Sequence, residues 1–159
     1  MTVTNAQLRE ALHYEPATGV FTWLITRGAV RAGQRAGCSK DGYIYIGIRG
    51  IQYYAHRLAW FYMTGDWPPL LDHRDRDKSN NSFDNLRIAT RPQNMANSSA
   101  SRTNTSGARG VSWDRKLGKW VAAITVHGRR QYLGLFPNVD AAQAAYNHAA
   151  VSAYGEFAT

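Results

Sequence analysis

The stretch LDHRDRDKSNNSFDNLR, residues 71–87, decides the fold of the first part of this chain. Its first residue, Leu71, ends a short apolar run that began at Leu70 and leads into Asp72 and His73. A polar loop follows, and the chain becomes apolar again at Leu86. Two short apolar runs joined by a polar loop are typical of paired strands. We therefore predict a strand that delivers the side chains of Asp72 and His73 into a site at its end.

A helix is predicted directly after the second strand. Residues 86–90 form the predicted partner strand, and Pro92 suits the first turn of a helix, where an N–H group is not needed. This helix carries Asn94, nine residues after Asn85. The expected order is strand, loop, strand, helix.

Four side chains of this region have the chemistry of a metal-assisted site for cutting phosphodiester bonds: Asp72, His73, Asn85 and Asn94. Carboxylate and amide oxygens are hard ligands for a magnesium-like ion, so Asp72 and Asn94 are the expected metal ligands. A histidine that is not a metal ligand can take a proton from water near neutral pH, so His73 is the expected general base. Asn85 is expected to orient it. Neighbouring side chains of a regular strand point to opposite sides, so both can serve one site only if the strand bends there.

The flanking motifs resemble those of the HNH endonucleases, in particular the phage homing-endonuclease branch. The resemblance covers roughly residues 1–97 and is carried by residues 53–60 (YYAHRLAW), 71–73 (LDH), 84–87 (DNLR) and 93–94 (QN). It implies a beta-beta-alpha metal fold in which His73 is the base, Asn85 its positioner, and Asp72 and Asn94 the metal ligands. Asn94 stands where the broader family has its last histidine, which favours magnesium, or manganese, over zinc. His56 is expected to be structural, hydrogen-bonded beneath the site.

The chain is expected to have an α+β fold in two domains. A nuclease domain should span residues 1–97 and begin with a helix capped by Thr4 that runs through Leu12. Residues 98–107 are small and polar without apolar periodicity, so they are the predicted linker. A second domain, residues 108–159, should contain three short antiparallel strands, separated at Gly118 and Gly128, packed on one helix.

In the second domain, the predicted strand 119–126 alternates between a core face and an open face. Residues 108–158 resemble the Apetala-type DNA-binding domain of plant ethylene-response factors, through motifs such as GKWVAAI (118–124) and YLGLF (132–136). The resemblance implies that the open face of the sheet enters the major groove of DNA. The residues expected to contact DNA are Arg109, Arg115, Lys119, Thr125, Arg130 and Tyr132. Ser112 and Thr125 replace arginines of the family's reading face, so the plant recognition sequence does not transfer.

Composition narrows the class of partner. The 159 residues include 19 Lys and Arg against 11 Asp and Glu, which gives a net charge of +8 and a pI near 9.9. This excess favours a polyanion, here double-stranded DNA, and no protein partner is implied. With 44% hydrophobic residues the chain has enough apolar side chains for packed cores.

The cysteine count and hydropathy favour an intracellular, cytoplasmic protein. Cys38 is the only cysteine, which excludes an intrachain disulfide and a thiolate-rich zinc site. No apolar run approaches the roughly 20 residues of a membrane helix, and no secretion signal is seen. The resemblance to phage nucleases further implies that the protein acts in a prokaryotic or phage-infected host cell.

The main hypothesis is a metal-dependent endonuclease, with magnesium as the expected ion, that cuts one or both strands of duplex DNA. The alternative is a non-catalytic, sequence-specific DNA-binding regulator that keeps the nuclease fold as a clamp. A third hypothesis, RNA binding, predicts a preference for structured RNA over duplex DNA at equal salt.

Overall fold

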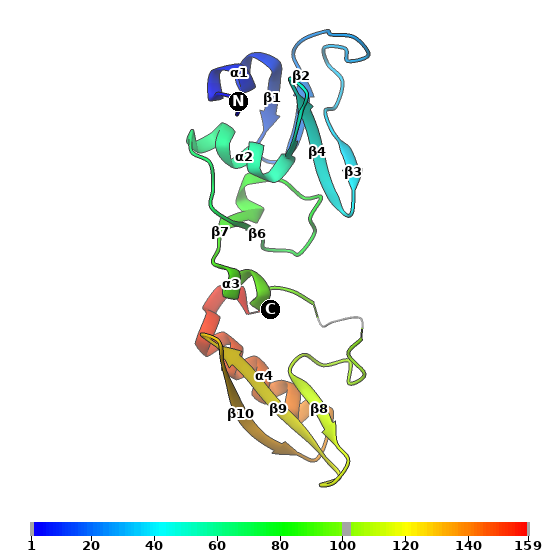
Figure 1. Ribbon diagram of the computed structural model, residues 1–159, viewed down its shortest axis with the longest axis vertical. Helices are drawn as coiled ribbons and strands as arrows, with labels where there is room; N and C mark the ends of the chain where they lie inside the picture. The colour runs from blue at the N-terminus through cyan, green and yellow to red at the C-terminus, as the bar shows by residue number, and fades with distance from the viewer. Residues whose placement is uncertain (1, 100–102, 159) are drawn as a thin grey trace. The chain divides into compact units, whose positions relative to one another are not determined.

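The computed structural model describes residues 2–99 and 103–158, and the chain divides into two compact units, residues 1–89 and 90–159 (Figure 1). Both units mix helices with small antiparallel sheets. The predicted end of the nuclease domain at residue 97 stays a prediction, and residues 100–102 of the predicted linker lie outside the described residues. Within the described ranges, no helix combines the length and the apolarity that a membrane crossing requires.

The first unit begins with helix α1 (Asn5–Ala11), which Thr4 caps as predicted. The Thr4 hydroxyl accepts from the Gln7 N–H and the Gln7 side chain accepts from the Thr4 N–H, each at 3.2 Å. The predicted extension of this helix through Leu12 is wrong. Leu12 has extended backbone angles and begins strand β1 (Leu12–Glu15), where it pairs with Trp23 of β2 (Val20–Trp23), so the strand pairing overrides the helical propensity of leucine.

A three-stranded sheet and one helix form the core of the first unit. The sheet has the order β3 (Cys38–Lys40), β4 (Tyr43–Ile48), β5 (Ile51–Tyr54), and helix α2 (Ala55–Thr64) packs against β4 and β5. Arg49 and Gly50 both have positive φ in the predicted turn between β4 and β5, as in tight hairpins. The buried side chains of this core include Leu8, Leu12, Tyr14, Phe21, Ile46, Leu58 and Ala59.

The stretch that opened the sequence analysis forms a small hairpin, as predicted. Strand β6 (Leu71–His73) pairs antiparallel with β7 (Leu86–Ile88), and the one-turn helix η1 (Phe83–Asn85) leads into β7. All three side chains of β6 are buried. The loop of residues 74–82 therefore begins directly after the buried His73 and ends just before η1, in which Asn85 is buried.

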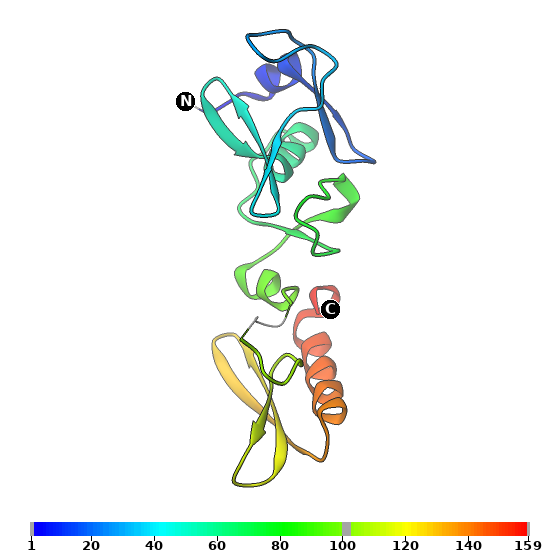
Figure 2. The same cartoon turned by 90° about the vertical axis from the view of Figure 1, so that its right-hand side faces the viewer.

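The second unit contains the predicted sheet and helix. Helix α3 (Arg91–Ala96) has Pro92 in its first turn, and the strands β8 (Val111–Asp114), β9 (Lys119–Val126) and β10 (Arg129–Phe136) form an antiparallel sheet in the order β10-β9-β8. Helix α4 (Val139–Tyr154) lies along one face of this sheet and is followed by the short helix η2 (Gly155–Phe157) (Figure 2). The predicted inner face of β9 is confirmed, since its residues pack with α4: Ala122, Ile124, and the partly buried Trp120 and Val126.

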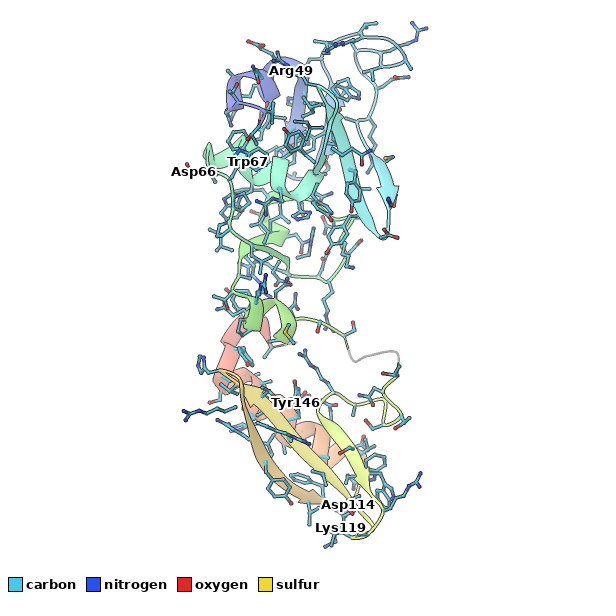
Figure 3. The ribbon with its side chains drawn as sticks, viewed as in Figure 1. Arg49, Asp66, Trp67, Asp114, Lys119 and Tyr146 are labelled. Carbon is cyan, nitrogen blue, oxygen red and sulfur yellow. The ribbon has the colours of Figure 1, made fainter. Side chains whose placement is uncertain are left out.

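Gly110 is a position where this packing leaves no room for a side chain. A Cβ atom there would lie 2.2 Å from the ring of Tyr146, a residue of α4 labelled in Figure 3, and 2.6 Å from the carbonyl oxygen of Ala123, at a φ of +67°. Gly118 has a similar φ of +58°, but nothing lies within 4 Å of its virtual Cβ. A comparison of alanine substitutions at the two glycines therefore separates the cost of a steric clash from the cost of backbone strain.

We predict that Gly110→Ala destabilises the second unit more than Gly118→Ala. The left-handed backbone costs about 1–2 kcal/mol in either variant, and overpacking adds about 1–3 kcal/mol only at Gly110. Urea denaturation followed by circular dichroism measures both free energies of unfolding. Equal losses in the two variants would contradict the close approach of Gly110 to α4.

Candidate active site

Strand β6 carries two adjacent polar side chains, Asp72 and His73, and both are buried. Asp72 lies opposite Arg87 and His73 opposite Leu86, in a pairing that is regular along the strand. The bend that would turn both side chains to one site stays a prediction. They remain close enough for the Asp72 carboxylate to favour the protonated form of the His73 ring.

Asp72 forms a buried ion pair with Arg87. The Nε and Nη2 atoms of Arg87 each lie 2.8 Å from Oδ2 of Asp72, and both side chains are about 95% buried. Both of these contacts fall on Oδ2. The sequence analysis identified Asp72 but not Arg87, although strand register would have paired them.

His73 is buried, and its ring lies against the amide of Asn81 and the rings of His56 and Tyr43. Its Nε2 lies 3.3 Å from Oδ1 of Asn81, and its ring centroid lies 5.0 Å from that of His56 and 6.3 Å from that of Tyr43. Burial lowers the pKa of His73, and the Asn81 hydrogen bond and nearby carboxylates oppose this only in part. The ring is therefore neutral near pH 7, the state a general base requires.

Asn85 organises the loop after His73. Its side chain accepts from the Asp75 N–H at 3.1 Å and donates to Asp75 Oδ1 at 2.9 Å and to the Asn80 carbonyl at 2.8 Å. Its own carbonyl accepts from the N–H of Arg74, the residue after His73, at 2.9 Å. The side chain of Asn85 thus acts on the loop, while the amide that contacts the His73 ring belongs to Asn81, which the sequence analysis did not select.

The loop carboxylate beside this network is held ionised. Burial alone would raise the pKa of Asp75, but hydrogen bonds from Asn80, Asn85 and the Asp77 N–H outweigh that effect and lower it. Asp75 accepts from Asn80 Nδ2 at 2.6 Å. The loop is therefore folded around a charged carboxylate, as polar turns of this composition commonly are.

His56, in the first turn of α2, lies beneath the site as expected. It is buried against His73 and the rings of Tyr43 and Tyr54. The hydrogen bond expected of it is not seen at Nδ1, which has no partner among the described residues. Burial lowers the pKa of His56 to about 3, and the neighbouring His73 contributes to this shift.

The buried histidine predicts a definite dependence of stability on pH. Unfolded, His56 binds a proton below its ordinary pKa of about 6.5, whereas folded it stays neutral until about pH 3. The unfolded state therefore binds more protons than the folded state between pH 3 and 6.5. The free energy of unfolding is thus highest above pH 6.5 and falls as the pH is lowered. Urea denaturation at pH 7.5 and pH 5 should show this fall, and His56→Phe should reduce it. An unchanged pH dependence in His56→Phe would contradict the prediction.

A group of tyrosines beside the site was missed by the sequence analysis. Tyr43, Tyr45 and Tyr54 share one face of the β3–β4–β5 sheet, with ring centroids 4.5 Å apart for Tyr45 and Tyr54 and 5.1 Å apart for Tyr43 and Tyr54. Lys78 of the loop places Nζ 4.6 Å from the centre of the Tyr43 ring. The alternation of Tyr43 and Tyr45 along one strand was the available signal.

The predicted metal ligands lie in different units. Asn94 is half-buried on α3 in the second unit, where its N–H donates to the Thr90 carbonyl at 2.9 Å. Among the described residues, no group of three or more His, Cys, Asp and Glu side chains could hold a metal ion. The chemistry of one carboxylate and one amide oxygen fits a hard cation such as magnesium better than zinc.

The residues expected to contact DNA fall into two groups. Lys119, Thr125, Arg130 and Tyr132 are exposed, and the register places Thr125 opposite Arg130 and Ala123 opposite Tyr132 on the open face. Figure 3 labels Lys119 with its cross-strand neighbour Asp114, and Arg115 is exposed in the turn between them.

Arg109 is placed differently from the others. Its guanidinium donates to the carbonyls of Ala96 at 2.5 Å and Ser98 at 2.9 Å, and also to that of Met95. These are carbonyls at the C-terminal end of α3, where a cation interacts favourably with the helix dipole. Arg109 therefore holds α3 within the second unit.

Comparison with known proteins supports the class that this site indicates. Residues 53–96 match the family described as HNH endonuclease, so the chain contains an HNH endonuclease domain. This segment includes Asp72, His73, Asn85 and Asn94. None of the comparisons supports the resemblance of residues 108–158 to the Apetala-type domain.

Two viral proteins are similar to part of the chain. "Protein 3.8" of Escherichia phage T7 is 32% identical over 77 residues, which cover 47% of this chain and 64% of that protein. "Uncharacterized HNH endonuclease L560" of Acanthamoeba polyphaga mimivirus is 35% identical over 88 residues, which cover 55% of this chain and 44% of that protein. The chain thus spans less than two thirds of the length of either relative, and no solved structure matches it.

Proposed function

We propose that this protein is a metal-dependent endonuclease that hydrolyses phosphodiester bonds in duplex DNA. The observation that carries the proposal is a buried carboxylate followed directly by a buried, neutral imidazole on β6, within the segment that matches the HNH endonuclease family. Hydrolysis needs a base to activate water and a positive charge at the phosphate. His73 would supply the first, and a cation bound by Asp72 would supply the second.

The proposed roles follow the chemistry of each side chain. His73 takes the proton from water, and Asn85 holds the loop on which the site is built. Asp72 would bind the divalent cation, magnesium or manganese, which when bound screens the phosphate charge and stabilises the departing oxygen. Asn94 stays the predicted second ligand.

The second unit would bind the DNA to be cut. Its open sheet face carries Lys119, Arg130 and Tyr132, of which Tyr132 is 64% exposed. Cations neutralise phosphates, and an exposed tyrosine packs on sugar or on a thymine methyl group. Binding through the sheet, with the helix behind it, is the mode that the resemblance to the Apetala-type domain implies.

The open face predicts a specific change in salt dependence. Lys119→Ala and Arg130→Ala should each weaken DNA binding and reduce the slope of log affinity against log salt by about 0.9, because each removes one phosphate contact. The matched control is Arg129→Ala, since Arg129 pairs with Val126, which packs toward α4. Fluorescence anisotropy with a labelled duplex at several salt concentrations measures the slopes. Equal slopes for Arg129→Ala and Arg130→Ala would contradict the assignment of the face.

The function itself is tested by relaxation of a supercoiled plasmid in magnesium, manganese or EDTA. We expect relaxed or linear DNA with either ion and intact plasmid in EDTA. A phage homing-type enzyme would in addition cut at a preferred site, which sequencing of the cut ends from a randomised DNA library would reveal. DNA binding without cleavage in any divalent ion would favour the non-catalytic regulator instead.

A further inference from the structure

We propose that Asn81 is a positioning residue that fixes which nitrogen of His73 carries its proton. The proposal rests on the proposed function for the role of His73, but the contacts that carry it belong to the first unit alone. Asn81 is 2% exposed, and its Oδ1 lies 3.3 Å from Nε2 of His73. An asparagine so deeply buried beside a polar loop has a stronger constraint than an ordinary turn residue.

The orientation of the Asn81 amide is set by a second hydrogen bond. Its Nδ2 donates to the carbonyl of Ser79 at 3.1 Å, so Oδ1 is the atom turned toward His73. An amide oxygen can only accept, and therefore Nε2 of His73 must be the donor. In the neutral ring, Nδ1 is then the nitrogen that holds the lone pair. The geometry thus places the proton of the neutral His73 ring on Nε2.

Asn81 is itself held by the N-terminal part of the chain. The hydroxyl of Tyr14, a buried residue of β1, donates to the Asn81 carbonyl at 2.7 Å. Gly19 lies so close that a Cβ atom there would be 2.2 Å from the carbonyl carbon of Asn81. The β1–β2 hairpin, outside the segment that matches the HNH family, therefore supports the amide that orients His73.

The tautomer of His73 can be measured without any cleavage assay. Long-range proton–nitrogen correlation spectra of the full chain, labelled with ¹⁵N, metal-free and near pH 8, distinguish a proton on Nε2 from one on Nδ1, and the His73→Gln spectrum assigns the signal. We expect only the Nε2–H form in the parent protein and in Asn81→Asp, which keeps the accepting oxygen. Asn81→Leu should show a mixture of the two forms, and Tyr14→Phe a smaller change in the same direction.

Cleavage kinetics test the consequence for the reaction. Asn81→Leu should lower kcat about 10- to 100-fold with little change in KM, as loss of a residue that orients a reacting group does. Asn81→Asp should recover most of this loss. The structural control is Asn5→Leu: Asn5 donates to the Phe61 carbonyl at 2.6 Å, so this variant should lose stability without a change in the His73 tautomer.

The outcomes separate this proposal from the proposed function. A protein that never cuts DNA but shows the Nε2–H form, lost in Asn81→Leu, keeps the positioning role and overturns the nuclease assignment. A protein that cuts DNA but has His73 protonated at Nδ1 overturns the positioning role alone. So does an Asn81→Leu variant with unchanged tautomer and unchanged kcat. If Asn81→Leu does not fold, the spectrum of the parent and the Tyr14→Phe variant still test the positioning role. A parent protein with His73 protonated at Nδ1 overturns this role. So does a Tyr14→Phe variant whose spectrum and kcat equal those of the parent.

Discussion

Replacing His73 by alanine should reduce plasmid cleavage in magnesium about 100- to 10,000-fold, the range lost when a general base is removed. The effect should be this large because burial keeps His73 neutral and hence able to accept a proton. Initial rates of relaxation of supercoiled plasmid, at DNA concentrations above and below KM, measure the loss. Most of it should appear in kcat, since a base acts in the reaction rather than in binding.

The exposed His13 of β1 provides the matched control. His13→Ala removes the same imidazole from the same unit and should cut DNA like the parent protein. Because His73 is buried, His73→Gln serves as a second variant that fills more of its space, and circular dichroism checks that both variants are folded. Cleavage within a few-fold of the parent in a folded His73→Gln protein would remove His73 from the role of base.

Local signals in the sequence were sufficient for most of the fold. The capping box at Thr4, the turn at Arg49 and Gly50, and the N-cap at Asn138 each depend on neighbouring residues, and the structure has all three. Strand β3 was not predicted because Cys38–Lys40 is exposed and has no apolar pattern of its own. Only its pairing with β4 makes it a strand.

The candidate site was less predictable than the fold, because it too depends on contacts between residues that are distant in sequence. The sequence indicated Asp72 and His73 because two functional side chains were adjacent at the end of an apolar run. Their partners are distant in sequence: Arg87 comes from the paired strand and Asn81 from the end of the loop. In a run of polar residues such as 74–82, nothing local distinguishes the one asparagine that the fold buries.

Loss of the Asp72 carboxylate should affect stability as well as cleavage. In Asp72→Ala the buried guanidinium of Arg87 loses its paired charge, which typically costs about 3–5 kcal/mol. Urea denaturation in EDTA measures this cost without any contribution from a bound cation. The exposed Asp66 is the matched control, and Asp66→Ala should change the free energy of unfolding by less than about 0.5 kcal/mol.

The same variant separates the ion pair from the proposed metal site. A structural role alone predicts that Asp72→Ala, assayed at a temperature where it is folded, cuts DNA at the same magnesium concentrations as the parent. A ligand role predicts that cleavage is lost, or returns only at much higher magnesium or manganese, because one oxygen donor of the cation is missing. Arg87→Met supplies the converse test: it removes the ion pair and keeps the carboxylate, so it should lose stability yet retain the cation dependence of the parent. Cleavage by folded Asp72→Ala with an unchanged magnesium dependence would exclude Asp72 as a ligand and leave it with the structural role of its ion pair with Arg87.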